Sequence, residues 1–127
     1  MIYEWALSLG LDAHHETENK QHYVVVNGHR IQVKLSTLWS NGEYRFQQIR
    51  DQNYEYLLCL GLSPDDVHTW LIPKEELLLH LQGRAGQHTG AGARETYWMA
   101  VAPGGGERWL VDYGSQLSDV RAALLAL

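Results

Sequence analysis

The chain has 127 residues, of which 45% are hydrophobic, and carries 10 basic and 15 acidic side chains for a formal net charge of −5. This length predicts one domain around a single core. The apolar runs are too short for a membrane-spanning helix, and the amino terminus lacks the basic region of a signal peptide. We therefore expect a soluble, cytoplasmic protein with no membrane partner.

The first predicted element is a short helix. Apolar residues at helical spacing predict an amphipathic helix over residues 2–9, which Gly10 ends. Its abrupt start suggests that a few residues of the ancestral domain are missing before it. The polar segment that follows, residues 14–22 (HHETENKQH), predicts a loop.

A β-hairpin comes next and is the strongest local prediction. Two β-branched runs, residues 23–26 and 29–35, flank Asn27-Gly28. Asn-Gly between apolar runs is the typical sequence of a two-residue hairpin turn, because both positions need a positive φ. Such a turn pairs Val26 with His29.

The rest of the chain is predicted to alternate helices and strands. Helices are expected over residues 44–53, 74–81 and 118–127, the last of them capped by Ser118, and strands over residues 56–62, 68–72 and 95–102. Residues 82–94 (QGRAGQHTGAGAR) predict a glycine-rich loop. This order indicates an α/β or α+β domain spanning 1–127, with a central mixed sheet flanked by helices, and with residues 82–127 packed as an appendix on a core of residues 1–81.

The single cysteine lies inside an apolar run, where a buried thiol is expected. Cys59 is surrounded by leucines in the predicted strand 56–62. One cysteine cannot form an intramolecular disulfide, and it also excludes a cysteine-based zinc cluster.

Charge is unevenly distributed along the chain. Residues 20–50 contain five basic side chains and one acid, Glu43, whereas the rest of the chain has five basic side chains and fourteen acids. This segregation allows one electropositive face on an acidic body.

One face of the predicted hairpin is polar. Strand alternation places Gln21, Tyr23, Gln32 and Lys34 on the same side. The simplest interpretation is that this side meets solvent. A hairpin followed by an apolar strand is normally central and covered on both faces, however, and Lys34 would then be buried unless it lined a cleft.

The arrangement of residues 30–37 resembles the PD-(D/E)XK nuclease superfamily. Gln32-Val33-Lys34 lies on the second hairpin strand, Ser36-Thr37 follows, and glutamine replaces the acid of the (D/E)XK signature. Small restriction-type and group I intron-associated endonucleases are similar in layout over residues 1–81. The resemblance implies a restriction-endonuclease-like core and a metal-dependent DNA endonuclease, a hydrolase that acts as a homodimer because cutting both strands requires two sites.

The resemblance also implies a catalytic centre. Hydrolysis of a phosphodiester would use Mg²⁺ or Mn²⁺, with the Gln32 side-chain oxygen and the Val33 carbonyl as ligands. Lys34 would orient the attacking water or offset charge in the transition state. Glu4, on the helix before the hairpin, matches an assisting carboxylate of the family.

The chain departs from the family at the start of the hairpin. The aspartate that normally faces the (D/E)XK pair is replaced by Tyr23 or Gln21, which are poor metal ligands. The nearest carboxylates are Glu16 and Glu18, and Glu18 is the expected third metal ligand and catalytic residue.

Polar residues around this centre are candidates for DNA contacts. Arginine and glutamine suit phosphate and base-edge contacts, and small polar residues suit backbone contacts. The predicted set consists of Ser36, Thr37, Arg45, Gln47, Gln48 and Arg50, with Gln87, His88 and Thr89 from the glycine-rich loop.

Two other functions remain open. The chain could be a catalytically inactive relative that binds DNA or acts as a subunit, or a small α+β interaction protein without a nucleic-acid role. The surroundings of Lys34 separate the three: beside carboxylates in a nuclease, buried without them in an inactive relative, and exposed in an interaction protein.

Overall fold

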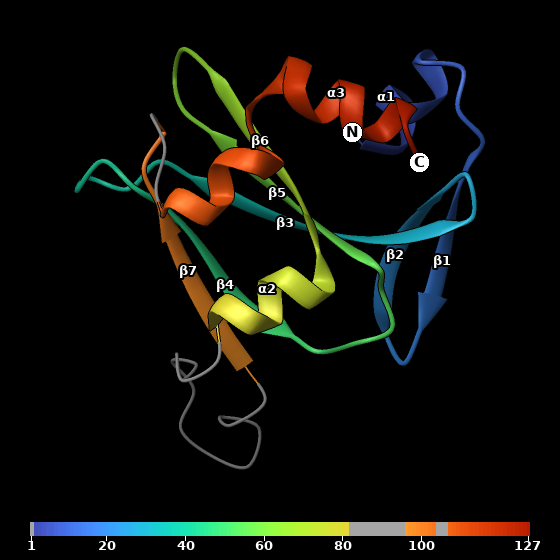
Figure 1. Ribbon diagram of the computed structural model, residues 1–127, viewed down its shortest axis with the longest axis horizontal. Helices are drawn as coiled ribbons and strands as arrows, with labels where there is room; N and C mark the ends of the chain where they lie inside the picture. Colours follow the sequence, from blue (N-terminus) through green and yellow to red (C-terminus); the bar gives the residue numbers. More distant parts are fainter. Residues whose placement is uncertain (1, 82–95, 104–106) are drawn as a thin grey trace.

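The computed structural model describes residues 2–81, 96–103 and 107–127. It is an α+β structure with a six-stranded mixed sheet in the order β1-β2-β3-β5-β6-β8 and a two-stranded sheet β4-β7 (Figure 1). The helices are α1 (Ile2–Ser8), α2 (Lys74–Leu81), α3 (Leu117–Leu125) and the 3₁₀ helix η2 (Arg108–Tyr113). The strands are β1 (Ala13–Glu18), β2 (Gln21–Val26), β3 (His29–Thr37), β4 (Tyr44–Arg50), β5 (Tyr56–Leu62), β6 (Val67–Pro73), β7 (Thr96–Val101) and β8 (Gly114–Gln116).

The predicted hairpin is confirmed. Val26 pairs with His29, and the turn residues Asn27 and Gly28 have φ of 49° and 84°. Asparagine and glycine adopt this left-handed conformation at low cost, which is why the pair marks such turns. The side chains alternate as expected, so that Tyr23 packs on one face of the sheet and Ile31 on the other.

The prediction of a loop over residues 14–22 is wrong, because this segment forms most of a second hairpin. β1 pairs antiparallel with β2 along its whole length, from Ala13↔Val26 to Glu18↔Gln21. The turn is made by Asn19 and Lys20, both with positive φ. β1 is an edge strand, where polar side chains face solvent, and its composition therefore resembles a loop.

The predicted helix over residues 44–53 is wrong, because this segment contains β4. Tyr44, Phe46 and Ile49 point into the core, and β4 pairs antiparallel with β7. A β-bulge between Phe46 and Ile49, with Gln48 at φ 56°, adds one residue to the strand. The bulge puts the two apolar residues three positions apart, which is also helical spacing, and this explains the misassignment.

The other predicted elements agree with the structure within a few residues, whereas η2 and β8 were not predicted. The strand predicted over 56–62 is β5, the helix predicted over 74–81 is α2, and α3 replaces the helix predicted over 118–127. At the start of α3 the Gln116 N–H donates to the Asp119 carboxylate (3.3 Å), so the cap is not Ser118.

The six-stranded sheet has one core on each face. α1 and α3 cover one face, and the β4–β7 ribbon, α2 and η2 cover the other (Figure 1). β3 and β5 are parallel neighbours in the sheet. The chain segment that connects them contains β4, which crosses over one face of the sheet. β7 pairs with β4 and β8 with β6, so residues beyond 81 complete both sheets.

The position of β4 over the sheet is fixed by close packing. The Tyr44 ring lies against Gly61 of β5, where an added Cβ would be 2.7 Å from the Tyr44 Cε2 atom. The Tyr44 hydroxyl also hydrogen-bonds to Nδ1 of His68 (2.9 Å). Glycine at position 61 therefore makes room for the tyrosine that anchors the ribbon. Within the described residues, no helix is long and apolar enough to span a membrane.

Candidate functional site

The polar residues of β3 face the ribbon. Ile31 and Val33 pack with α1 and α3, so alternation directs Gln32, Lys34 and Ser36 to the opposite side, where β4 crosses. Ser36 is connected directly to β4, because its hydroxyl accepts a hydrogen bond from the Arg45 backbone N–H (2.9 Å).

A groove of about 380 Å³ opens where β4 leaves β3. Leu35 and Trp39 form part of its wall. The other lining residues are all candidates from the sequence: Lys34, Ser36, Thr37, Arg45, Gln47 and Gln48. The structure therefore brings these predicted residues together, although their segment is a strand and not the expected helix.

Lys34 is a half-buried cation that has no ion-pair partner among the described residues. Burial lowers its pKa below the ordinary lysine value, and the positive charge of Arg50 lowers it further. Its neighbour across the parallel ladder is Cys59, a buried thiol whose pKa is raised by burial. Among the residues that the structure describes, no carboxylate contributes to the shift at Lys34.

Arg45 is held between two tryptophans. Its guanidinium carbon lies 4.7 Å from the Trp39 ring centroid and 5.2 Å from that of Trp98 on β7. The Nε atom is buried and has no hydrogen-bond partner among the described residues. Across the same part of the chain, neither Arg45 nor the nearby Arg50 forms an ion pair.

The residues expected to bind a metal do not converge. Gln32 is buried, and its Nε2 donates to Oε1 of Gln21 (3.4 Å) and Gln52 (3.3 Å). Its own Oε1 has no partner in the described residues. Val33 pairs with Leu58 in the sheet. Gln32 thus belongs to a cluster of neutral amides.

The carboxylates expected at the metal site either form ion pairs or lie far from Lys34. The Arg30 guanidinium binds the carboxylates of both Glu16 and Glu18 (2.5 Å each), and Asn53 donates to Glu18 (3.1 Å). The Arg30 hydrogen bond is the main cause that lowers the pKa of Glu18. Glu4 lies on α1, which packs on the opposite face of the sheet from Lys34.

Taken together, the donor set does not fit Mg²⁺ or Mn²⁺. Among residues 2–81, 96–103 and 107–127, no three His, Cys, Asp or Glu side chains are grouped to hold a metal ion. A divalent cation needs several oxygen ligands with net negative charge. Arg50 places a second positive charge near Lys34, and the side-chain oxygens that bind the Gln32 amide belong to the neutral amides of Gln21 and Gln52.

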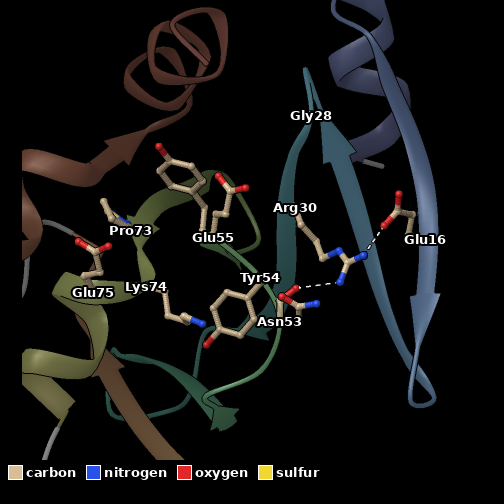
Figure 2. Close-up of a pocket in the computed structure, with 10 residues that line it drawn as sticks. Glu16, Gly28, Arg30, Asn53, Tyr54, Glu55, Pro73, Lys74 and Glu75 are labelled. Atoms are coloured by element: carbon tan, nitrogen blue, oxygen red, sulfur yellow. Dashed lines mark hydrogen bonds and ion pairs between the residues drawn. The ribbon is translucent and has the colours of Figure 1, made fainter.

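A second, larger cleft of about 840 Å³ lies beside the hairpin (Figure 2). Arg30 enters it from β3 with Glu16 opposite, and Lys74 enters it from the start of α2. Lys74 Nζ donates to the Gln52 carbonyl (2.9 Å), lies 3.2 Å from Asp51 and is 5.5 Å from the Tyr54 ring centroid. The cations of this cleft therefore have partners within the chain.

Sequence reasoning did not find this ion-pair network. Glu16 and Glu18 share a face of β1, which alternation would have revealed only if the segment had been recognised as a strand. The predicted DNA contacts Gln87, His88 and Thr89 lie outside the described residues.

Similarity to known proteins gives no further assignment of this groove. No protein-family model matches the chain, and no curated protein or solved structure is significantly similar to it.

Proposed function

We propose that the chain binds nucleic acid in the β3–β4 groove and does not hydrolyse it. The observation that carries this proposal is the cluster of Lys34, Arg45 and Arg50, cations without an ion-pair partner in the described chain. A protein with net charge −5 has many carboxylates that could neutralise them. Phosphate groups would supply the missing negative charge.

The energetics of Lys34 support a ligand-binding role. A half-buried ammonium beside another cation is destabilising, as its lowered pKa reflects. An apolar side chain of similar length would avoid this cost. Retaining an unfavourable charge is typical of functional sites, where stability is traded for binding.

The neighbouring side chains suit the same ligand. Thr37 and Gln48 are exposed, and the amide of Gln47 lines the groove beside them. Hydroxyl and amide groups can bind phosphate, sugar or base edges. The bulge at Gln48 bends β4 next to the groove, and such bulges often redirect side chains at sites.

Binding should depend strongly on salt. Three phosphate contacts predict a slope of log K against log[salt] of about −2 to −3. We would measure fluorescence anisotropy of labelled DNA and RNA oligonucleotides between roughly 50 and 200 mM salt. The triple variant Lys34→Gln, Arg45→Gln, Arg50→Gln should lose binding and most of the slope.

A matched control separates the groove from net charge. The variant Lys20→Gln, Arg108→Gln, Arg121→Gln removes the same charge from exposed positions outside the groove. It should bind like the wild type. Equal loss in both triple variants, or no binding by the wild type, would refute the proposal and favour an interaction protein.

The metal-dependent endonuclease is the second candidate, with a restriction-endonuclease-like core, DNA as substrate and a homodimeric state. The observation that favours it is the buried Gln32 Oε1, which has no hydrogen-bond partner among the residues that the structure describes. Supercoiled plasmid and single-stranded DNA would be incubated with Mg²⁺ or Mn²⁺ and either wild type or Lys34→Ala. Metal-dependent cutting that disappears in the variant would replace our proposal, whereas salt-sensitive binding without cutting supports it.

A further inference from the structure

We infer that the groove takes single-stranded nucleic acid and that one unpaired base stacks on Trp39. The inference rests on the proposed function, and it names the class of nucleic acid. Trp39 lines the groove and is 43% exposed, whereas Trp70 in the core is 1% exposed. Among the large hydrophobic side chains exposed in the described chain, Trp39 is the only tryptophan.

Trp39 is held in place before any ligand binds. Its backbone N–H donates to the Glu43 carbonyl (2.9 Å), and its carbonyl accepts from the Gly42 N–H (2.9 Å). Asn41 closes the same turn by accepting from the Glu43 N–H (3.1 Å). The Arg45 guanidinium stacks against the indole. A fixed aromatic side chain loses little conformational entropy when a base stacks on it.

Base stacking requires a free base face. In a duplex each base is covered by its neighbours above and below, so an indole reaches a base face without the cost of unstacking only where the strand is unpaired. Aromatic side chains beside a cationic path are the recurrent feature of single-strand binding sites. Here the cations Lys34 and Arg45 share the groove with Trp39.

The shape of the groove also favours a single strand over a duplex. Proteins read duplex DNA by inserting a protruding helix or β-ribbon into a wide groove. The Lys34 and Arg45 side chains instead line a hollow of about 380 Å³. A phosphodiester backbone could follow the cations while one base turns toward Trp39. Nothing in this contact depends on the sugar, so DNA and RNA strands share the required chemistry.

Four oligonucleotides of equal length separate base stacking from charge. They are oligo(dT), an abasic strand with the same phosphates, and a duplex, with oligo(rU) added to compare the sugars. We expect oligo(dT) and oligo(rU) to bind about tenfold or more tightly than the abasic strand and the duplex, and to quench tryptophan fluorescence. Abasic or duplex binding equal to oligo(dT) would overturn the inference while leaving the proposed function intact.

Variants at position 39 test the residue itself. Trp39→Leu should reduce oligo(dT) affinity about tenfold, to the abasic level, with abasic binding unchanged. Trp39→Phe keeps a ring and should retain most of the affinity. The control outside the groove is Trp109→Phe. Trp109 lies on η2, where its ring stacks on His80 with 4.3 Å between the ring centroids. Undiminished oligo(dT) binding by Trp39→Leu would overturn the inference, and no binding to any strand would overturn the proposed function as well.

Discussion

Two groups of cations lie on the same face of the sheet and differ in one respect. Arg30 and Lys74, beside the cleft in Figure 2, each bind carboxylates or carbonyls of the chain. Lys34 and Arg45, which line the groove, and Arg50, whose charge acts on Lys34, have no ion pair within the described residues. The first group is already satisfied by the fold. Only the second group leaves positive charge for a ligand, although the cleft is the larger cavity.

The first prediction concerns a variant in which a groove cation gains a carboxylate neighbour, as the cations of the cleft already have. Lys34→Glu would give Arg50 a carboxylate neighbour and would repel phosphate, so affinity for oligonucleotides should fall about 100-fold in anisotropy titrations. Lys20→Glu makes the same change in net charge at the exposed β1–β2 turn and should have little effect. A similar loss in both variants would mean that total charge, and not the groove, controls binding.

The second prediction moves one wall of the groove and leaves the cleft untouched. Gly61→Ala would drive a methyl group into the Tyr44 ring, at 2.7 Å from Cε2. Overpacking of this kind costs about 1–3 kcal/mol of unfolding free energy. Denaturant unfolding measures it, and nucleic-acid affinity should fall as β4 shifts. An unchanged unfolding midpoint would show that Tyr44 does not hold the ribbon in place.

The third prediction compares matched lysines from the two groups. Lys74→Met removes an ion pair, a hydrogen bond and a ring contact and should cost about 1 kcal/mol. Lys34→Met removes a charge that has no counter-ion in the described part of the chain, and it should leave stability unchanged or raise it. Chemical denaturation of both variants tests this. Loss of stability in Lys34→Met would reveal a hidden partner and remove the distinction between the groups.

The smallest expected effect is a pH dependence that belongs to Lys34. Its pKa is lowered in the folded chain, so between that value and the ordinary 10.5 the unfolded chain binds more protons. Lys34 should therefore contribute stability that rises with pH across this window, whereas Cys59 and Tyr54, whose pKa values are raised by burial, contribute in the opposite direction. Affinity for phosphate should fall as Lys34 loses its charge. Burial lowers the pKa of Lys34 most, the charge of Arg50 lowers it further, and Cys59 acts in the opposite direction. Lys34→Arg stays protonated, so the difference between the wild-type and variant curves for unfolding and for binding should isolate both contributions of Lys34.

The fold was predictable from sequence where the signal was local. Asn27-Gly28 determines a turn by its own backbone preference, and the prediction for this hairpin is confirmed. β4 was not predictable in this way. Its bulge at Gln48 disrupts the two-residue alternation, and its pairing with β7 joins segments far apart in the sequence. Non-local pairing and bulges leave no simple periodic pattern.

The groove residues were predictable for a different reason. Lysine, arginine and glutamine were selected for the chemistry of their side chains, which does not depend on whether residues 44–50 are helical or extended. Their convergence was beyond the sequence, because it requires the position of β4 over the sheet. The pairing of Arg30 with Glu16 was missed since it needed the polar strand β1 to be recognised first.

The stack of Trp39, Arg45 and Trp98 has a consequence for folding. Trp39 and Arg45 meet through a short turn, whereas Trp98 arrives on β7, from a distant part of the chain. Contacts between distant segments form late, because a long loop must close before they gain any stabilisation. A nascent chain would therefore acquire the hairpin before it acquires a complete groove. Binding competence should appear only with the last docking step, which couples the site to completion of the fold.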